Sequence, residues 1–307
     1  MSEPLVSIVI PTLNSQKTVE STLESLSILD YDNFEVIVVD SYSTDKTLNI
    51  VSKYVEKYKI RIVMEKRRGR GVAYNRGIFE SRGKYVAFLD SDARVGTSSW
   101  IKNAVKIMEN DDSVGVVFTK VYSPPDSKFI QKSIDTFLCK GFTTANGAIY
   151  RKEAVIKVGG FNENMNYMQE DELLYKLEKA GYKYKVNFDD KIYHYHRDSI
   201  KSYVKQNMEA AIGAKYFYKI TRERWVIRDA VLRLSTFLLS IILVITLAIF
   251  NPKILGLLLL LFYILILLKT EFETCPQYKW SKYVYFSPFL IYLSIVGYSI
   301  GFLTRKE

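Results

Sequence analysis

Two carboxylates, Asp90 and Asp92, stand one residue apart directly after a short apolar run. That run, from Val86 to Leu89, is continuously apolar, which is typical of a strand covered on both faces of a parallel sheet. Side chains at positions i and i+2 of an extended chain point the same way, so the pair can bind one divalent cation, Mg²⁺ or Mn²⁺. A cation held there can neutralise a diphosphate. The alternative interpretation is an acidic turn on the surface.

The segments before Asp90 predict where this pair lies. Strands are predicted at 6–10, 34–39, 60–64 and 86–89, with helices at 15–29, 43–55 and 72–80 between them. This alternation predicts an α/β fold with a doubly wound, mostly parallel sheet. Ligands bind at the carboxyl ends of such strands, where Pro11, Asp40, the basic loop 66–71 and the acidic pair would meet.

The composition is that of a folded protein with an anionic partner. The 307 residues are 48% hydrophobic and 25% charged, which excludes a disordered chain. The net charge of +10 favours phosphate ligands, anionic lipid or nucleic acid. Cys139 and Cys275 match no metal or redox spacing, so we expect both to be reduced. The first residues lack a signal-peptide pattern, so we expect the N-terminal domain in the cytoplasm.

Eight motifs resemble, in order and spacing, those of the family 2 glycosyltransferases, which have the GT-A fold. They are 6–14 (VSIVIPTLN), 35–47 (EVIVVDSYSTDKT), 71–78 (GVAYNRGI), 89–92 (LDSD), 147–154 (GAIYRKEA), 158–161 (VGGF), 169–173 (QEDEL) and 179–182 (KAGY). The resemblance covers about residues 5–200. It implies an inverting enzyme that uses a nucleotide-sugar donor and a divalent metal.

The resemblance also assigns roles to residues at the predicted sheet edge. The nucleotide-sugar-binding residues that it implies are Pro11, Thr12, Asn14, Asp40, Arg70, Asp90 and Ser91. Asp40 would contact the nucleotide base, and Asp90 with Asp92 would carry the metal and the diphosphate. Ser41 and Tyr42 replace the acidic or small pair that is usual after Asp40, which bears on the choice of base or donor.

A second acidic pair, Glu170 and Asp171, opens a predicted helix. On the residues alone, the pair compensates the helix dipole. The resemblance makes one of the two the catalytic base that deprotonates the acceptor. Counting back from the motif at 179–182 favours Glu170, whereas matching the Glu-Asp letters favours Asp171, so both are candidates.

His194 and His196 are the only two histidines, and they alternate on a predicted strand at 191–196. One interpretation is that both histidines have a structural role, because a histidine more often packs or hydrogen-bonds than binds a ligand. The resemblance implies that a histidine near this point lies close to the diphosphate or its metal. Both are therefore candidate metal ligands beside Asp90 and Asp92.

The C-terminal third has the composition of a membrane anchor. Residues 197–230 are basic, amphipathic and rich in aromatic side chains, which predicts helices in the membrane interface. Three apolar helices are predicted at about 232–250, 252–269 and 283–304, the second spanning only if its flanking lysines snorkel. The predicted regions are a cytoplasmic catalytic domain over 1–196, interfacial helices over 197–230 and a transmembrane region over 231–307.

Basic residues predict the orientation of this anchor. They flank the predicted spans on one side and are Arg222, Arg224, Arg228, Arg233, Lys269, Lys279 and Lys282. This excess places the catalytic domain on the cytoplasmic side of the cell membrane. Arg305 and Lys306 would then lie outside, which counts against the arrangement.

We therefore expect a membrane-anchored, metal-dependent inverting glycosyltransferase that moves a sugar from a nucleotide-sugar to a hydroxyl of a lipid-linked saccharide. The first alternative is a polyprenyl- or dolichyl-phosphate sugar synthase, and a catalytically silent membrane scaffold is another. A processive polysaccharide synthase is disfavoured by the absence of its Gln-x-x-Arg-Trp motif. A dehalogenase-like phosphatase is disfavoured because three predicted strands precede the acidic pair. The expected partners are the donor, the lipid-linked acceptor and membrane lipids, with no nucleic acid and with homo-oligomer formation left open.

Overall fold

The computed structural model describes residues 3–138 and 143–304, except for the side chains of residues 247 and 250. The chain forms two compact units. The first comprises residues 1–124 and 142–195, and the second comprises residues 125–141 and 196–307.

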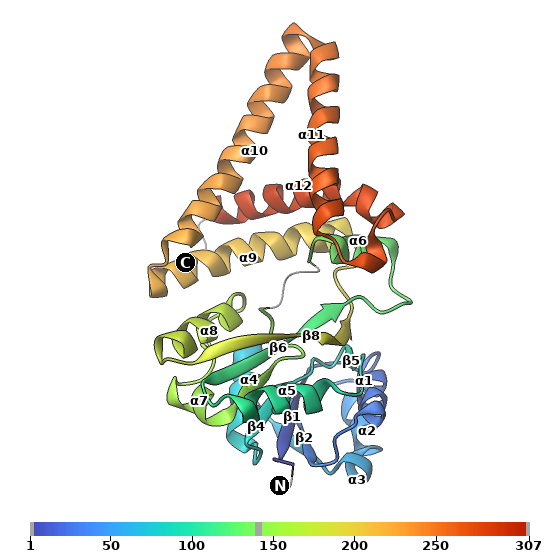
Figure 1. The fold of residues 1–307 in the computed structure, drawn as a ribbon, viewed down its shortest axis with the longest axis vertical. Coiled ribbons are helices and arrows are strands. Elements are labelled where there is room, and N and C mark those ends of the chain that lie inside the picture. The colour runs from blue at the N-terminus through green and yellow to red at the C-terminus, as the bar shows by residue number, and fades with distance from the viewer. Residues whose placement is uncertain (1–2, 139–142, 305–307) are drawn as a thin grey trace. The chain divides into compact units, whose positions relative to one another are not determined.

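The first unit is built on an eight-stranded mixed sheet with the order β3-β2-β1-β4-β7-β6-β8-β5 (Figure 1). The strands are β1 (Val6–Thr12), β2 (Phe34–Asp40), β3 (Ile60–Met64), β4 (Tyr85–Phe88), β5 (Ala93–Val95), β6 (Val114–Tyr122), β7 (Ile149–Arg151) and β8 (Lys183–His194). Strand β1 runs parallel to β2 and β4, β2 runs parallel to β3, and β6 runs parallel to β8. Strand β7 pairs antiparallel with β4 and β6, and β5 pairs antiparallel with β8. The predicted α/β fold with a mostly parallel sheet is confirmed.

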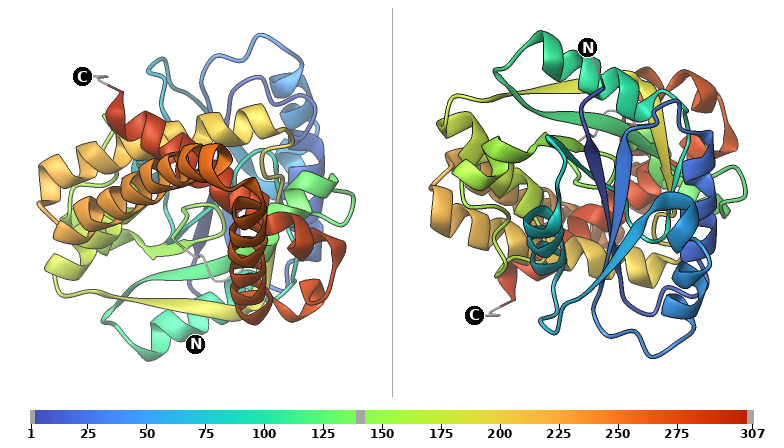
Figure 2. Two further views of the ribbon diagram at one scale, coloured as in Figure 1. Left: turned by 90° about the horizontal axis from the view of Figure 1, so that it is seen from above. Right: turned by 90° about the horizontal axis from the view of Figure 1, so that it is seen from below.

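Helices cover both faces of this sheet, as the view from below shows (Figure 2). Side chains of β1 alternate between two cores, with Ile8 in one and Val9 in the other. The first core includes α1 (Val19–Ser25), η1 (Leu26–Ile28), α2 (Thr47–Ser52), α3 (Val55–Tyr58) and α5 (Trp100–Asn110), and the second includes α4 (Arg70–Glu80), α7 (Lys152–Lys157) and α8 (Gln169–Lys179). Burial on both faces explains the continuously apolar strands.

The strand order reverses beside β1. From β1 the chain moves outward to β2 and β3, and then returns to form β4 on the other side of β1. The connections that leave β1 and β4 therefore diverge, and the carboxyl ends of two such strands are where open parallel sheets bind their ligands. Thr12 ends β1, and Asp90 follows β4 by two residues.

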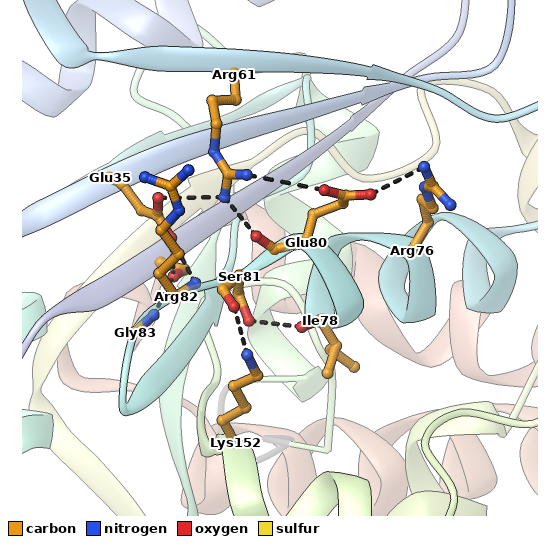
Figure 3. Close-up of polar contacts among 10 residues, drawn as sticks. Glu35, Arg61, Arg76, Ile78, Glu80, Ser81, Arg82, Gly83 and Lys152 are labelled. Atoms are coloured by element: carbon orange, nitrogen blue, oxygen red, sulfur yellow. Dashed lines mark hydrogen bonds and ion pairs between the residues drawn. The ribbon is translucent and has the colours of Figure 1, made fainter.

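A network of ion pairs fixes the opposite, amino-terminal edge of the sheet (Figure 3). Glu35 of β2 accepts a hydrogen bond from the Ser7 hydroxyl of β1 at 2.7 Å, and Arg61 Nη2 of β3 lies 3.2 Å from it. Arg61 and Arg76 also approach Glu80, at 3.8 and 2.9 Å. These charged side chains are thus paired with one another at this edge.

The second unit consists of helices. They are α6 (Phe129–Leu138), α9 (Ile200–Thr221), α10 (Arg224–Phe250), α11 (Pro252–Glu273), η2 (Pro276–Tyr278) and α12 (Lys282–Leu303). Three of them, α10, α11 and α12, are long and apolar enough to cross a membrane. They contain nearly all of the three apolar segments predicted from the sequence.

Cys275, between α11 and η2, is disulfide-bonded, which corrects the expectation that it is reduced. Sequence spacing could not predict this, because a disulfide depends on the distance between two cysteines in the fold. Cys139 lies outside the described residues.

Candidate active site

Three side chains gather at the carboxyl edge of the sheet as potential metal ligands. Ligand atoms of Asp90, Asp92 and His194 all lie within 4.8 Å of one another. The antiparallel pairing of β5 with β8 places Ala93 opposite His194, which brings the imidazole beside the loop after β4. Two carboxylates and an imidazole in this arrangement fit Mn²⁺ or Mg²⁺.

Within this group, Asp92 Oδ1 lies 3.2 Å from His194 Nε2. Burial by itself would raise the pKa of Asp92, but the hydrogen bond with His194 and its charge lower that pKa. Burial would likewise lower the pKa of His194, but the hydrogen bond with Asp92 and the charge of Asp92 raise it. Asp92 and His194 thus favour opposite charges and hydrogen-bond to each other. A bound cation could take the place of this hydrogen bond.

The other acidic residue, Asp90, is held through its carboxylate and through its backbone nitrogen by two residues that the sequence analysis did not identify. Tyr74 Oη of α4 donates to Asp90 Oδ1 at 2.8 Å, and Asp90 N donates to Asn146 Oδ1 at 3.1 Å. Asn146 Nδ2 is buried and has no hydrogen-bond partner among the described residues, so it can donate to a ligand. Tyr74 lies inside a quoted motif and Asn146 directly precedes one, which is the signal that could have found them.

Arg70, predicted to bind the donor, is the first residue of α4. Its Nη1 lies 3.8 Å from Glu170 Oε1. Burial alone would lower the pKa of Arg70, but Tyr74, Asp90 and Glu170 raise it. Arg70 therefore forms a long ion pair with Glu170 and lies within electrostatic range of Asp90.

Glu170 and Asp171 occupy the first turn of α8. Burial raises the pKa of Glu170, and the charge of Arg70 partly offsets this effect. Burial and the charge of Glu170 raise the pKa of Asp171 to about 6, although a hydrogen bond with Thr143 opposes the shift. A carboxylate with that pKa is still ionised at neutral pH and accepts a proton more readily than an ordinary aspartate.

Hydrogen bonds join the loops after β1 and β2, where the nucleotide pocket is predicted. Pro11 pairs with Val39 in the sheet, and Asn14 N donates to Ser43 Oγ at 2.9 Å. Ser15 Oγ lies 2.7 Å from Ser91 Oγ, which ties the loop after β1 to the metal-binding loop. The structure therefore brings together the predicted residues of the pocket and of the metal site.

Asp40 is fully buried in this pocket. Its carboxylate accepts hydrogen bonds from Thr12 Oγ1 and from Ser43 N, each at 2.7 Å. Asp40 thus fixes the loop that follows it. That loop exposes 47% of Tyr42, whose backbone has a left-handed φ of 60°.

His196 corrects one prediction. Strand β8 ends at His194, so the alternation that would carry His196 to the same face does not continue. His196 Nε2 instead lies 2.8 Å from Asp135 Oδ1 of α6, and Tyr278 Oη donates to Asp135 Oδ2 at 2.6 Å. Among the described residues, the group of potential metal ligands contains His194 and not His196.

Residues 7–163 match the family model described as Glycosyl transferase family 2, which covers just over half of the chain. The chain belongs to this family. The expectation of a family 2 glycosyltransferase is therefore confirmed.

Relatives carry the same activity in their names. The amylovoran biosynthesis glycosyltransferase AmsB of Erwinia amylovora is 29% identical over 210 residues, covering 60% of this chain and 67% of AmsB. The poly(ribitol-phosphate) beta-N-acetylglucosaminyltransferase TarS of Staphylococcus aureus is 28% identical over 226 residues, or 70% of this chain. The chain spans only about a third of TarS, since the match covers 35% of its length.

A solved structure extends the likeness to the whole chain. The mannosyltransferase PcManGT from Pyrobaculum calidifontis, in complex with GDP-Man and Mn²⁺, covers 100% of this chain and 89% of its own with a TM-score of 0.72. At 21% sequence identity, this likeness shows a common fold. This chain therefore shares with PcManGT the arrangement of a GT-A-type sheet followed by C-terminal helices.

Proposed function

We propose that this chain is a membrane-anchored, metal-dependent, inverting glycosyltransferase that moves a sugar from a nucleotide-sugar to a hydroxyl of a lipid-linked saccharide on the cytoplasmic face. One observation carries the proposal: Asp90, Asp92 and His194 gather at the carboxyl edge of the sheet, and Arg70 links them electrostatically to the acidic pair. AmsB and TarS, named for polymer biosynthesis and for a poly(ribitol-phosphate) acceptor, support a saccharide or related polymer as acceptor. PcManGT, which holds GDP-Man and Mn²⁺, supports the donor class and the metal.

On the donor side, Asp90, Asp92 and His194 would hold the metal, which when bound supplies positive charge beside the leaving diphosphate. Tyr74 fixes the orientation of Asp90 through its hydrogen bond. Arg70 adds a second positive charge at the same edge. Positive groups placed in advance stabilise charge that develops as the glycosidic bond breaks.

On the acceptor side, Asp171 is the better of the two candidate bases. Glu170 is buried and its charge is offset by Arg70 at 3.8 Å. Asp171 is more exposed, and its pKa of about 6 suits proton abstraction near neutral pH. The proton of the acceptor hydroxyl passes to Asp171 as the acceptor oxygen bonds to the anomeric carbon. The nucleoside diphosphate leaves from the opposite side of that carbon, which inverts its configuration.

The need for a base separates the two acceptor classes. A sugar hydroxyl must lose its proton as the new bond forms, whereas a polyprenyl phosphate oxygen is already ionised near neutral pH. A positioned base accelerates the first reaction by about 100- to 10,000-fold and contributes little to the second. A base of suitable pKa at Asp171 therefore favours a hydroxyl acceptor.

The test is to incubate membranes that contain the protein with a panel of radiolabelled nucleotide-sugars and to extract the lipid phase. We expect label to enter a lipid-linked saccharide, and we expect Asp171→Asn to abolish this transfer. Glu178→Gln, an exposed acid on the same helix, is the matched control and should transfer normally. Labelled polyprenyl phosphate sugar, formed equally by Asp171→Asn, would establish the synthase alternative instead.

A further inference from the structure

We propose that α12 lies along the membrane surface, and that the chain crosses the bilayer only through α10 and α11. Hydropathy alone treats the three helices alike. Their burial differs, because 39% of the apolar window of α12 is buried inside the protein, against 6% for α10 and for α11. The inference rests on the membrane anchor in the proposed function and adds its topology.

The C-terminal end of α12 lies beside the charged N-terminal part of α10, before the apolar part of that helix begins. The Arg233 guanidinium stands over the Tyr298 ring, 4.8 Å from its centroid. Arg233 is the last charged residue of α10 before its apolar run. Lys215 Nζ of α9 donates to the carbonyl oxygens of Phe302 and Thr304 at 3.1 and 2.6 Å. Charged side chains thus surround this end, as they do at a membrane surface.

The N-terminal end of α12 also lies among polar groups. It follows α11 through a short connection that contains Lys279, and it begins at Lys282. Lys132 Nζ of α6 lies 5.9 Å from the centre of the Tyr283 ring. A helix that crossed the hydrocarbon core would have its two ends about 30 Å apart along the membrane normal, but both ends of α12 meet charged groups at the base of the α10–α11 hairpin.

Between its ends, α12 packs closely against α9. A Cβ atom on Gly297 would lie 2.8 Å from the Val204 carbonyl oxygen, and one on Gly301 would lie 2.2 Å from that of Met208. Two glycines four residues apart therefore let the two helix backbones touch on successive turns. Figure 1 shows α9 and α12 running across the base of the hairpin, and Figure 2, seen from above, shows them crossing.

Helix α9 cannot lie in the hydrocarbon core. Its exposed lysines are spread along its length and are Lys201, Lys205 and Lys219. Lysine is costly at the centre of a bilayer but favourable beside anionic headgroups. Because the backbone of α12 packs directly against the backbone of α9, the two helices lie together in one layer at the membrane interface. The apolar side chains that α12 exposes, such as Phe289 and Leu303, then face the acyl chains.

This topology puts the end of the chain on the side of α9. Only five residues separate the end of β8 from α9, and they reach at most about 18 Å, which is too short to cross a bilayer. The catalytic unit and the C-terminus therefore face the same compartment. Thr304, the last residue that the structure describes, then lies on the same side as the basic residues between α11 and α12, which the positive-inside rule places on the cytoplasmic face.

Sidedness labelling of the full chain in intact bacterial cells tests the inference. Single cysteines are introduced as Asn251→Cys or Thr304→Cys after Cys139→Ser and Cys275→Ser, and a membrane-impermeant maleimide is added before or after lysis. We expect the cysteine at 251, between α10 and α11, to react in intact cells, and the one at 304 to react only after lysis. Labelling at 304 in intact cells would establish a third span, and protection at 251 would show that the hairpin does not cross.

A second pair of variants tests the contact itself. Gly301→Leu should separate α12 from α9 and lower the thermal midpoint of the detergent-solubilised protein by about 4 °C or more. Gly256→Leu on α11, where a Cβ meets nothing within 4 Å, is the matched control and should change little. Equal midpoints for both variants would overturn the packing. Release of the wild-type chain from membranes by carbonate would instead refute the anchor in the proposed function, independently of the labelling result.

Discussion

His194 Nε2 lies 3.2 Å from Asp92 Oδ1, and this contact joins the last residue of β8 to the loop that follows β4. The contact exists because β5 pairs with β8. It places an imidazole beside two carboxylates, and so turns an acidic pair in the sequence into a group with three potential ligands.

We predict that Asp92→Asn lowers metal-dependent transfer by about 100-fold or more, because one anionic ligand is lost and the diphosphate is less well stabilised. Initial rates measured against Mn²⁺ and Mg²⁺ concentration check this. Asp189→Asn, an exposed aspartate of β8, serves as the control and should behave as wild type. Full activity of Asp92→Asn with the metal chelated would contradict the assignment.

For Asp171, we predict that kcat/KM of the wild-type enzyme falls as the pH drops through about 6, where the base becomes protonated. Asp171→Asn should lower the rate at pH 7 by about 100- to 10,000-fold and remove this pH dependence. The pH–rate profile of both forms is the measurement. A profile that keeps its acidic limb in Asp171→Asn would transfer the role to Glu170.

The same residue has a predictable effect on stability. Its pKa in the folded protein is about 6, above the ordinary value of 3.8, so protonation favours the folded state. The ionised carboxylate therefore destabilises the fold above about pH 6, and this cost disappears as the pH falls toward 4. Asp171→Asn should raise the thermal midpoint at pH 7 but not at pH 4. Equal thermal midpoints of the wild type and Asp171→Asn at pH 7 would show that burial of the ionised Asp171 carboxylate does not destabilise the fold.

Tyr74 offers a test of positioning. We predict that Tyr74→Phe raises the metal concentration for half-maximal activity by about 10-fold, because a hydrogen bond to a charged group contributes about 1.5–3 kcal/mol. The maximal rate at saturating metal should change much less. Tyr58→Phe is the matched control, since Tyr58 is also buried and its hydroxyl has no hydrogen-bond partner among the residues that the structure describes. Loss of the maximal rate alone would assign Tyr74 to the chemical step.

The sequence predicted the first half of the fold well because local patterns determine it. The strand predicted at 60–64 coincides with the observed strand Ile60–Met64, and the carboxylates that follow the strands mark the ligand edge. The pairing of β5 with β8, and of β7 with β4 and β6, was not predicted, since strands of three residues carry too little periodicity. The position of Asn146 beside Asp90 depends on that pairing of distant segments.

The histidines show the same limit in the candidate site. Alternation along a strand predicted that His194 and His196 share a face, but it could not predict that β8 ends between them. Similarly, hydropathy predicted α12 but not its burial against α9, because Gly297 and Gly301 have no signal until their partner is known. In each case the outcome depends on which distant segment packs against the residue in the fold, and the sequence pattern does not identify that segment.

The final prediction concerns Tyr42, which stands in the loop after Asp40 with a left-handed φ of 60° and 47% of its surface exposed. A residue other than glycine in this conformation costs about 1–2 kcal/mol, so Tyr42→Gly should not lower thermal stability. If the ring stacks on the nucleotide base, its loss should weaken donor binding by about 10-fold or more, since stacking contributes about 1–3 kcal/mol. Lys59→Gly is the matched control: Lys59 has a φ of 51° at the end of α3, and its replacement should leave the donor Kd unchanged. Donor Kd measured by calorimetry for both variants decides the question, and an unchanged Kd in Tyr42→Gly would show that the ring does not touch the base.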